Sequence, residues 1–444
     1  MKYFGTDGFR GEAGKVLTAD HAYKIGRYLG WYYGREKRGR IVIGKDTRRS
    51  SYMFEYALVA GIISSGSDAY LLHVTTTPSV AYVVRTEDFD CGVMVSASHN
   101  PYTDNGIKLM DSNGHKMSAA VESQIEDYLD GKSDPVPFAI GENIGVAIDY
   151  AIGRNRYIGY LISLATRSYK GKRIGLDCAN GSTFNIAKSV FDALGAKTYV
   201  VGNEPNGLNI NQNCGSTHIE NLVSLVKEKE LDCGFAFDGD ADRCIAVDET
   251  GQVIDGDYII YICGTYLKKH GRLDGNHVVA TIMANLGLFK ALEKNGIEYD
   301  VTTVGDKYVN EDMVAKGYVL GGEQSGHIIF SKHATTGDGI LTAIMVMEVI
   351  MEEKTSLHTL ASGMKKYPQL LKNVKVSDKD AILNNKKVQE CKEEIEQELK
   401  GNGRMLLRAS GTEPVIRVMA EADTKELCAK YVDQMVDVIE SELK

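Results

Sequence analysis

The sequence predicts an α/β protein of three similar domains with mixed sheets, followed by a smaller C-terminal α+β domain, arranged around a central cleft. Three observations predict this fold. The chain has 444 residues, which is too long for a single hydrophobic core. One succession of strand, helix and strand occurs three times. Each occurrence is followed by an apolar run that stops in an unusual polar loop.

Each repeat begins with an apolar run that is typical of a buried strand: RIVIGKD from Arg40, RIGLDCAN from Arg173 and HVVATIMAN from His277. The helical stretch that follows ends near a glycine, because glycine accepts the left-handed conformation found after many helices: Gly66, Gly195 and Gly296. A second strand comes next, with the sequence DAYLLHV, AKTYVV or EYDVTTV. This βαβ pattern predicts sheets that are covered by helices.

A further apolar run in each repeat ends in a polar loop. CGVMV leads into SASHNP, CGFAF into DGDADR, and GYVLG into GEQSGH. Ligands of open α/β sheets bind beyond the carboxyl ends of the strands, so we expect these three loops to meet in one cleft.

The last segment has a different pattern. A strand (NVKV) precedes a helix that Gly401 ends, with one apolar face formed by Val388, Cys391, Ile395 and Leu399. The strands MLLR and VIRVMAEA follow, joined by ASGTEP, and a final helix begins near Thr424 and carries Leu427, Tyr431, Met435 and Val438. We place the domains at residues 1–150, 151–254, 255–368 and 369–444.

Composition limits the classes of partner and the location. A net charge of −9 gives no reason to expect nucleic acid or an anionic membrane as a partner. The eight cysteines form no CxxC pair and predict neither a zinc site nor a disulfide framework. The start MKYFGTDGFRG lacks a signal sequence, and the longest apolar stretch, ILTAIMVMEVIM, is too short to span a bilayer. We therefore expect a cytoplasmic protein without membrane insertion.

Asp238, Asp240 and Asp242 alternate in the run GFAFDGDADRC, directly after a strand-like segment. Gly239 and Ala241 are small enough for the chain to bend so that the three carboxylates converge. Like charges are not buried together without a partner. Grouped carboxylate oxygens suit Mg²⁺, which commonly links protein carboxylates to a phosphate. The run therefore predicts a Mg²⁺ site in a protein that handles phosphate.

Two other interpretations of this run remain open. Counting from Asp238, the aspartates and Glu249 match positions 1, 3, 5 and 12 of a calcium-binding EF-hand loop. Arg243 stands at position 6, where that loop needs glycine, and the flanking segments are typical of strands rather than helices. A solvated acidic turn is the simpler alternative.

Ser98 and His99 in VMVSASHNPYTDNG invite comparison with a serine hydrolase. Neighbouring side chains of an extended segment point apart, however, and no GxSxG motif surrounds the serine. A structural turn with Asn100 and Pro101 is a second interpretation. A serine that carries a phosphoryl group fits better, because the metal at the aspartates would neutralise the charge of the phosphate.

Two more loops have chemistry suited to a sugar phosphate. In RASGTEPVIR, glycine lets backbone amides approach an anion while hydroxyls donate and arginines supply charge; the residues are Arg408, Ser410, Gly411, Thr412 and Arg417. An ordinary turn between strands is the alternative there. In GEQSGH, Glu323, Ser325 and His327 suit sugar hydroxyls, although each alone is more often structural or solvated.

Five segments occur in the order FGTDGFRG, SASHNP, DGDADR, GEQSGH and RASGTEP, and they resemble the signature loops of the α-D-phosphohexomutases over essentially the whole chain. Gln324, the run NCGSTH at 213–218 and the run TTGDGILTA at 335–343 are similar to the phosphoglucosamine mutase branch. The resemblance implies three α/β domains and a smaller fourth around a central cleft. It also implies a phosphoserine at Ser98, with Mg²⁺ held by this phosphate and by Asp238, Asp240 and Asp242.

Three positions depart from the pattern of that branch. Ala409 stands where proline is usual, Ala241 where glycine is usual, and Lys307 where arginine is usual. Ala409 changes the stiffness of its loop without removing a ligand, and Ala241 needs only an allowed φ. Lys307 lacks the bidentate fork of arginine, so the resemblance does not extend to a phosphate contact there.

The activity implied by the resemblance is the interconversion of glucosamine 6-phosphate and glucosamine 1-phosphate, a step toward amino-sugar nucleotides and cell-wall precursors. The phosphoserine would donate its phosphoryl group and form glucosamine 1,6-bisphosphate, with Mg²⁺, Arg10 and Arg243 stabilising the charge. Glu323 and Ser325 would hold the sugar, and the RASGTEP loop the other phosphate. Three residues are candidates for moving the hydroxyl proton: His99, Lys108 and His327.

Other functions stay open at this point. The same chemistry on mannose or glucose phosphates is the nearest alternative, because Gln324 alone rarely discriminates strongly. A phosphatase of the haloacid dehalogenase type would use Asp238 as its nucleophile, and a non-catalytic paralogue would bind sugar phosphate without accepting phosphate. Some bacterial relatives form homodimers and bind a membrane diadenylate cyclase, so the resemblance implies both kinds of partner.

Overall fold

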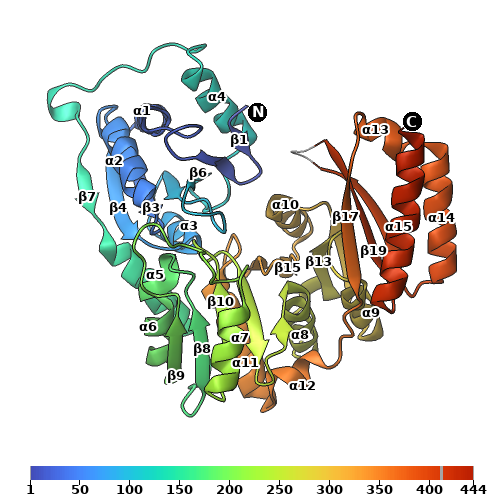
Figure 1. Ribbon diagram of the computed structural model, residues 1–444. Helices are drawn as coiled ribbons and strands as arrows, with labels where there is room; N and C mark the ends of the chain where they lie inside the picture. The colour runs from blue at the N-terminus through green and yellow to red at the C-terminus, as the bar shows by residue number, and fades with distance from the viewer. Residues whose placement is uncertain (1, 411–413, 444) are drawn as a thin grey trace. The chain divides into compact units, whose positions relative to one another are not determined.

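The computed structural model describes residues 2–410 and 414–443, and the chain forms two compact units (Figure 1). The first unit holds the chain up to Met283 together with Ile297–Ser362. The second holds Ala284–Gly296 and the chain from Gly363 onward. The first unit contains three mixed sheets with helices, and the second contains an antiparallel sheet. The predicted fold class, three α/β domains and a smaller C-terminal domain, is confirmed.

The first sheet has seven strands in the order β1-β2-β6-β5-β3-β4-β7. Their bounds are β1 Phe4–Gly5, β2 Gly8–Glu12, β3 Arg40–Lys45, β4 Asp68–Val74, β5 Cys91–Val95, β6 Asp104–Met110 and β7 Ala147–Asp149. The helices of this part of the chain are α1 Ala19–Gly34, α2 Arg49–Ile63, α3 Thr77–Thr86 and α4 Ala119–Leu129.

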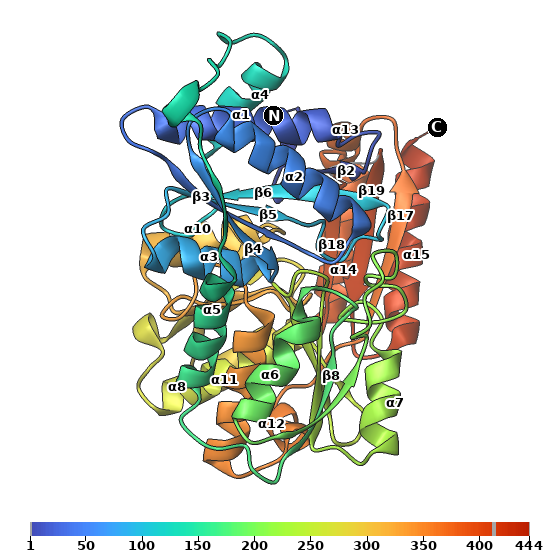
Figure 2. The same ribbon diagram turned by 90° about the vertical axis from the view of Figure 1, so that its left-hand side faces the viewer.

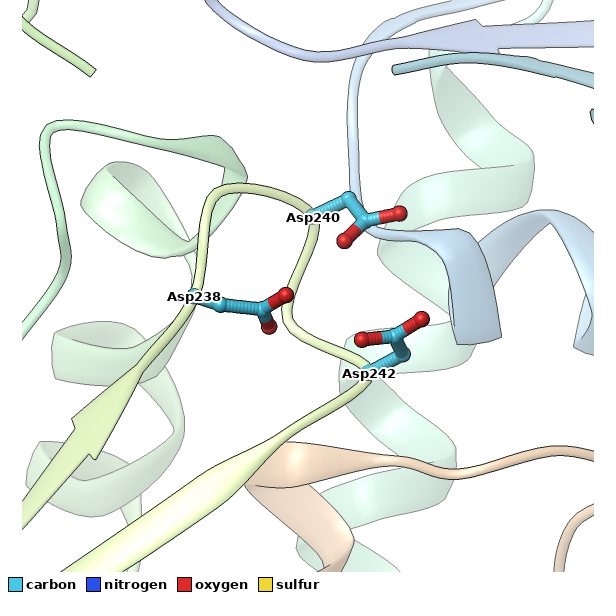
Figure 3. Close-up of side chains that lie close together, drawn as sticks. All are labelled: Asp238, Asp240 and Asp242. Carbon is cyan, nitrogen blue, oxygen red and sulfur yellow. The ribbon is translucent and has the colours of Figure 1, made fainter. Parts of the chain in front are cut away.

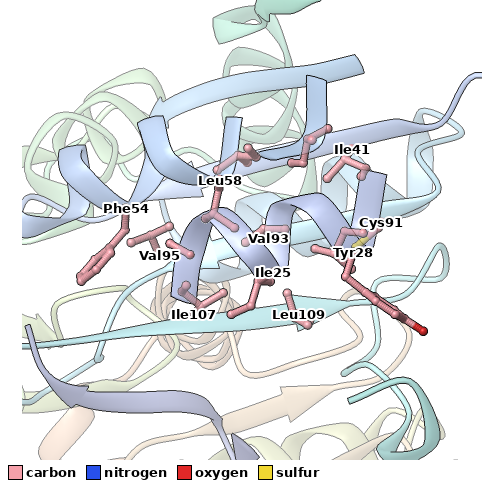
Figure 4. Close-up of a cluster of buried hydrophobic side chains, with 14 of the residues drawn as sticks. Ile25, Tyr28, Ile41, Phe54, Leu58, Cys91, Val93, Val95, Ile107 and Leu109 are labelled. Atoms are coloured by element: carbon pink, nitrogen blue, oxygen red, sulfur yellow. The ribbon is translucent and has the colours of Figure 1, made fainter. Parts of the chain in front are cut away.

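Helices cover both faces of this sheet, as the βαβ pattern predicts (Figure 2). Ile41 and Ile43 of β3 pack with side chains of α1 and α2 in one buried cluster (Figure 4). Val42, between them, packs on the opposite face with Val80 and Val84 of α3. Because both faces are covered, β3 is a continuous apolar run rather than an alternating one.

The second and third sheets repeat the central part of the first. Their strand orders are β12-β11-β10-β8-β9 and β14-β13-β15-β16. The strands are β8 Arg173–Asp177, β9 Lys197–Val201, β10 Cys233–Phe237, β11 Cys244–Asp248, β12 Val253–Ile254, β13 His277–Thr281, β14 Glu298–Thr302, β15 Leu320–Gly322 and β16 Ile328–Phe330. The helices are α5 Ala151–Leu164, α6 Ala187–Ala193, α7 Glu220–Glu228, α8 Gly256–Lys269, α10 Asp306–Lys316, α11 Gly339–Glu353 and α12 Leu357–Ala361. Short 3-10 helices lie at Gly141–Asn143, Ser182–Asn185 and Asp274–Asn276.

One rule places the three polar loops. In each sheet a central strand (β3, β8 or β13) pairs in parallel with a strand on either side. One of these neighbours (β5, β10 or β15) then turns into an antiparallel partner (β6, β11 or β16). The loops SASHNP, DGDADR and GEQSGH are these turns, so each lies at the carboxyl end of a parallel strand, where α/β sheets bind ligands.

The second unit has the strand order β17-β19-β18, all antiparallel. Its elements are α9 Leu286–Lys294, β17 Gln369–Lys375, α13 Lys379–Leu383, α14 Lys386–Leu399, β18 Arg404–Ala409, β19 Val415–Glu421 and α15 Lys425–Glu442. The predicted apolar face of α14 is buried, and the side chain of Thr424 caps α15.

The predicted face of α15 is partly wrong. Tyr431 and Met435 are buried as expected, but Leu427 is 36% exposed. The buried face also includes Cys428, Val432 and Ile439. The face of α15 that packs on the sheet is therefore wider than the four predicted positions, and its centre is shifted toward these three side chains.

All eight cysteines are buried with free thiols. Within the part of the chain that the structure describes, no helix is long and apolar enough to cross a membrane.

The close packing of α1 on α2 generates a stability prediction. A Cβ on Gly61 would lie 2.2 Å from the carbonyl oxygen of Tyr23, whereas a Cβ on Gly159, which is exposed in α5, meets nothing within 4 Å. We expect Gly61→Ala to lower the thermal midpoint by several degrees, since overpacking of this kind costs about 1–3 kcal/mol. The control Gly159→Ala should leave the midpoint unchanged or raise it, because alanine favours helix by about 0.5–1 kcal/mol. Equal midpoints for the two variants in thermal melts would contradict the close helix contact.

Candidate functional site

The three aspartates of the predicted metal site converge in the turn between β10 and β11 (Figure 3). Asp238, Asp240 and Asp242 are 1%, 0% and 6% exposed, and one carboxylate oxygen of each lies within 4.8 Å of the others. Ala241 has φ = 61°, so the turn places a residue with a Cβ in the left-handed region, where glycine is favoured. The buried arrangement is neither a solvated acidic turn nor an EF-hand between helices.

Lys108 of β6 supplies the main positive charge to this turn. Its Nζ lies 2.7 Å from Asp240 Oδ2, 3.3 Å from Asp242 Oδ2 and 3.1 Å from Asp7 Oδ2. The hydroxyl of Thr77 also donates to Asp240 Oδ2 at 2.5 Å. Burial lowers the pKa of Lys108, but the carboxylates of Asp240, Asp7 and Asp242 outweigh burial and raise it above the ordinary range. The ammonium is therefore retained at neutral pH.

The carboxylates retain acceptor capacity for a cation. Asp240 Oδ1 and Asp242 Oδ1 are buried and have no hydrogen-bond donor among the described residues. Burial and the charges of Asp242 and Asp240 raise the pKa of Asp238 well above its ordinary value. Burial has the same effect on Asp242, but Lys108, His327 and Arg243 outweigh it and lower the pKa of that group. Hard oxygen ligands with unfilled lone pairs fit a divalent cation such as Mg²⁺.

Ser98 lies directly against this group. Its Oγ donates to Asp238 Oδ2 at 2.5 Å, and its Oγ and His99 Nδ1 are 3.3 Å apart. The expectation that the two neighbouring side chains point apart is therefore wrong. Ser98 has φ = 51°, so this part of the loop is left-handed rather than extended, and the alternation of side chains does not apply.

Positive charges from two further segments surround His99. Burial, Arg243 and Arg10 lower the pKa of His99 from 6.5 to about 4, so its ring is neutral at pH 7. Arg10 of β2 forms a salt bridge with Asp7. Arg243 directly follows the aspartates. Burial lowers its pKa, but the charges of Asp238, Asp242 and Glu323 outweigh burial and raise it. Arg10, His99 and Arg243, which the sequence predicts as site residues, therefore lie close enough to influence one another electrostatically.

The GEQSGH loop contributes side chains of different exposure. His327 is buried, and its Nε2 lies 3.5 Å from Asp306 Oδ2. Glu323 is half-buried and accepts a hydrogen bond from the amide of Gly305 at 3.0 Å, whereas Ser325 is exposed. Gln324 donates to Asp257 Oδ2 at 3.2 Å. His327 therefore belongs to the charged cluster, and Ser325 faces solvent.

Three charged residues of the cluster were not predicted from the sequence. Lys116 Nζ lies 3.3 Å from Asp7 Oδ1 and 2.7 Å from Asp306 Oδ2, which joins the first sheet to α10 of the third. Asp7 lies within the FGTDGFRG motif, which could have identified it as a site residue. Lys116 and Asp306 lie outside the five motifs, so no pattern in the sequence pointed to them. A cavity of about 550 Å³ opens beside them, and Lys108, Asp242, Lys307 and His327 are among its lining residues.

The second unit carries the other predicted phosphate loop. Arg408 of β18 and Arg417 of β19 are directly paired across the sheet. Burial and Arg417 lower the pKa of Arg408. Ser410 is buried, and its carbonyl accepts from Lys379 Nζ at 2.7 Å. Gly411 and Thr412 lie outside the described residues. Two like charges opposite each other are unfavourable alone, and an anion would relieve their repulsion.

Comparison with known proteins identifies the family. Residues 1–135, 155–251 and 255–367 match alpha/beta/alpha domains I, II and III of phosphoglucomutase/phosphomannomutase, and residues 371–438 match the C-terminal domain. The chain belongs to the phosphoglucomutase/phosphomannomutase family. Among relatives of this family, a phosphoglucosamine mutase from Lachnoclostridium phytofermentans is 62% identical over 99% of this chain and 98% of its own length.

Solved structures of the same family share the fold. A phosphoglucomutase/phosphomannomutase family protein from Burkholderia thailandensis has a TM-score of 0.80 at 21% identity, covering 99% of this chain and 97% of its own. The Aspergillus fumigatus N-acetylphosphoglucosamine mutase, in complex with GlcNAc-6P and magnesium, has a TM-score of 0.69 at 18% identity and covers 100% of this chain and 96% of its own.

The environment of His99 generates a pH prediction. The folded protein keeps the ring neutral down to a pH of about 4, whereas the unfolded chain protonates it near 6.5. The stability that depends on the neutral ring is complete above pH 6.5 and is lost as the pH falls toward 4. We expect His99→Gln to reduce the drop in thermal midpoint between pH 7 and pH 5, measured on unphosphorylated protein. The control His218→Gln, at an exposed position, should keep the wild-type drop. The same drop in both variants would contradict the assignment.

Proposed function

We propose that the protein interconverts glucosamine 6-phosphate and glucosamine 1-phosphate, with Ser98 as the residue that carries the phosphoryl group. The observation that carries this mechanism is the position of the Ser98 hydroxyl, 2.5 Å from a buried carboxylate of the aspartate group. A phosphoryl group on this hydroxyl would lie beside the predicted metal ligands, and phosphoryl transfer depends on such positioning and charge stabilisation. The full-length phosphoglucosamine mutase relatives, at 49–62% identity, support the choice of an amino sugar.

Mg²⁺ is the cation that these oxygens would hold, together with the phosphate on Ser98. Asp238, Asp240 and Asp242 are the protein ligands that we assign, because two of them have buried oxygens without donors. When bound, the ion neutralises negative charge on the transferring phosphoryl group. The Aspergillus fumigatus family member whose structure contains magnesium supports this assignment.

The proposed reaction consists of two phosphoryl transfers. The phosphoryl group would move from phosphoserine 98 to the free O1 of glucosamine 6-phosphate and give glucosamine 1,6-bisphosphate. The other phosphate of this intermediate would then return to Ser98. Arg10 and Arg243 lie close enough to lower the pKa of His99, and their charges would stabilise the same region of the transition state.

We assign to His99 the proton of the Ser98 hydroxyl: the ring would accept it when the second phosphate returns to Oγ and give it back to Oγ when the phosphoryl group next leaves. Its ring is neutral at pH 7 and already lies 3.3 Å from Ser98 Oγ. Lys108 keeps its proton because three carboxylates surround it, so it serves as a fixed positive charge in this arrangement. His327 is held by Asp306, farther along the same cluster.

The sugar and its second phosphate need separate contacts. Glu323 and Ser325 would bind ring hydroxyls, and the loop with Arg408, Ser410, Gly411, Thr412 and Arg417 would bind the phosphate that is not reacting. We place the enzyme in the cytoplasm, in the synthesis of amino-sugar nucleotides such as UDP-N-acetylglucosamine and of peptidoglycan precursors. A second copy of this chain and a diadenylate cyclase are the protein partners that we propose from the family resemblance.

The first test of the proposed function is a mutase assay with matched serine variants. Phosphorylated protein with Mg²⁺ should form glucosamine 1-phosphate faster than it converts glucose or mannose 6-phosphate. Ser98→Ala should lose at least about 10³-fold in kcat, because the phosphoryl carrier is gone. Ser189→Ala, at an exposed serine of α6, should keep the wild-type rate.

Three results would contradict the proposal. Free phosphate as the main product would indicate a phosphatase, particularly if label from the substrate were found on Asp238. A preference for a neutral hexose phosphate would indicate the mannose or glucose branch. Full activity of Ser98→Ala would exclude Ser98 as the carrier.

The second test concerns the link between the metal and the phosphate. If the phosphoserine completes the coordination, phosphorylated protein should bind Mg²⁺ about 10–100-fold more tightly than dephosphorylated protein, because a charged oxygen ligand is added to the site. Isothermal titration calorimetry on the two forms measures this ratio, and Asp240→Asn should weaken binding in both. Equal affinities of the two wild-type forms would show that the phosphate is not a ligand.

A further inference from the structure

The loop that carries Ser98 is held through its backbone by two side chains that the mechanism does not use. The carboxamide Nδ2 of Asn211 donates to the carbonyl oxygens of Ser98 at 2.8 Å and of Asn100 at 3.0 Å. The guanidinium Nη2 of Arg48 donates to the same two oxygens, at 3.1 Å and 2.6 Å. Arg48 directly precedes α2, and Asn211 lies in the loop after β9 of the second sheet.

We propose that Asn211 and Arg48 are positioning residues for phosphoryl transfer, which fix the backbone of Ser98 so that its Oγ points at the aspartate group. This inference rests on the proposed function, because it assigns a role in presenting the residue that carries the phosphoryl group. Neither side chain touches the reacting atoms. Both act through the carbonyl groups of residues 98 and 100.

The conformation of Ser98 shows why such support is needed. Its φ of 51° is in the left-handed region, which is unfavourable for a residue with a Cβ. An unsupported loop would relax toward the extended region and move Oγ away from Asp238. Four hydrogen bonds on the carbonyl groups of Ser98 and Asn100 oppose that change, since turning the Ser98 peptide would leave buried donors without acceptors.

The two donors are themselves fixed. Asn211 is buried and also has a left-handed backbone, at φ = 58°. Its backbone N–H donates to the carbonyl oxygen of Ala179 at 2.8 Å. Arg48 is fully buried, and it forms a salt bridge with Asp46, which Ser51 also contacts at 2.6 Å.

Gly239 closes the remaining side of the loop. A Cβ at this position would lie 2.5 Å from the Ser98 carbonyl oxygen, so the metal-binding turn packs directly on the serine backbone. The same contact therefore sets the distance between the phosphoryl carrier and the aspartates.

The test compares two asparagines of one loop. Asn211→Asp keeps the shape of the side chain but replaces the donor with a carboxylate, which repels both carbonyl oxygens. Asn213→Asp is the control, because Asn213 has a left-handed backbone at φ = 52° and is exposed. The measurements are the rate at which glucose 1,6-bisphosphate phosphorylates Ser98, followed by mass spectrometry, and the kcat per phosphorylated chain with glucosamine 6-phosphate.

A positioning role predicts a specific combination of results. Asn211→Asp should still reach full phosphorylation, but slowly, and its kcat per phosphorylated chain should fall about 10–100-fold, since a misplacement of roughly 1 Å costs on the order of 10². KM should stay within about threefold, because the sugar contacts are elsewhere. Asn213→Asp should match the wild type in every measurement.

Other results overturn the inference. If Asn211→Asp only reduces the fraction of chains that accept phosphate, with the wild-type kcat for those that do, the role is structural. Should that variant fail to fold, Asn211→Gly, which suits the left-handed backbone and lacks the donor, carries the same test. A wild-type chain that never carries phosphate on Ser98 overturns the proposed function and this inference with it. A phosphorylated wild type whose kcat equals that of Asn211→Asp overturns this inference alone.

Discussion

Three carboxylates buried in one short turn need compensating charge, and the structure supplies it from distant parts of the chain. Lys108 of the first sheet contacts Asp240 and Asp242 of the second, and the hydroxyl of Thr77, at the start of α3, donates to Asp240. A buried carboxylate without such partners would lose several kcal/mol of hydration without replacement. The aspartate turn can therefore be buried only when the first and second sheets are assembled around it, which ties the geometry of the site to the packing of the first unit.

The same requirement extends to the third sheet through a chain of alternating charges. Asp7 contacts both Lys108 and Lys116, and Lys116 contacts Asp306 at the start of α10. Asp306 in turn lies beside His327 of the GEQSGH loop. Each inner member of this series has a charged neighbour on either side, so removing Lys116, for example, leaves Asp7 and Asp306 with less compensating charge. Catalytic candidates from three sheets are thus linked by contacts that also stabilise the assembly.

Much of this arrangement was predictable from the sequence because it follows from local patterns. The three βαβ repeats have continuous apolar runs and closing glycines, and each polar loop follows the apolar run that places it at a strand end. The aspartate group was predictable because all three residues lie within five positions. Contacts across more than a hundred residues, such as Asn211 with the Ser98 loop or Lys116 with Asp306, leave no pattern in a single sequence. The contact of Ser98 with His99 was mispredicted because a left-handed φ is invisible in the residue types alone.

The second unit is discontinuous in the chain, because it includes α9 as well as the C-terminal sheet. Asn285, just before α9, donates to Glu421 of β19 and to the carbonyl of Tyr367, and Lys290 within α9 contacts Asn402. A fragment that starts after residue 362 would therefore lack this hydrogen-bond donor to Glu421, which is buried in the complete chain. The C-terminal module of this chain is thus not separable by a single cut. Separating it requires cuts at three positions, because the chain passes between the two units three times.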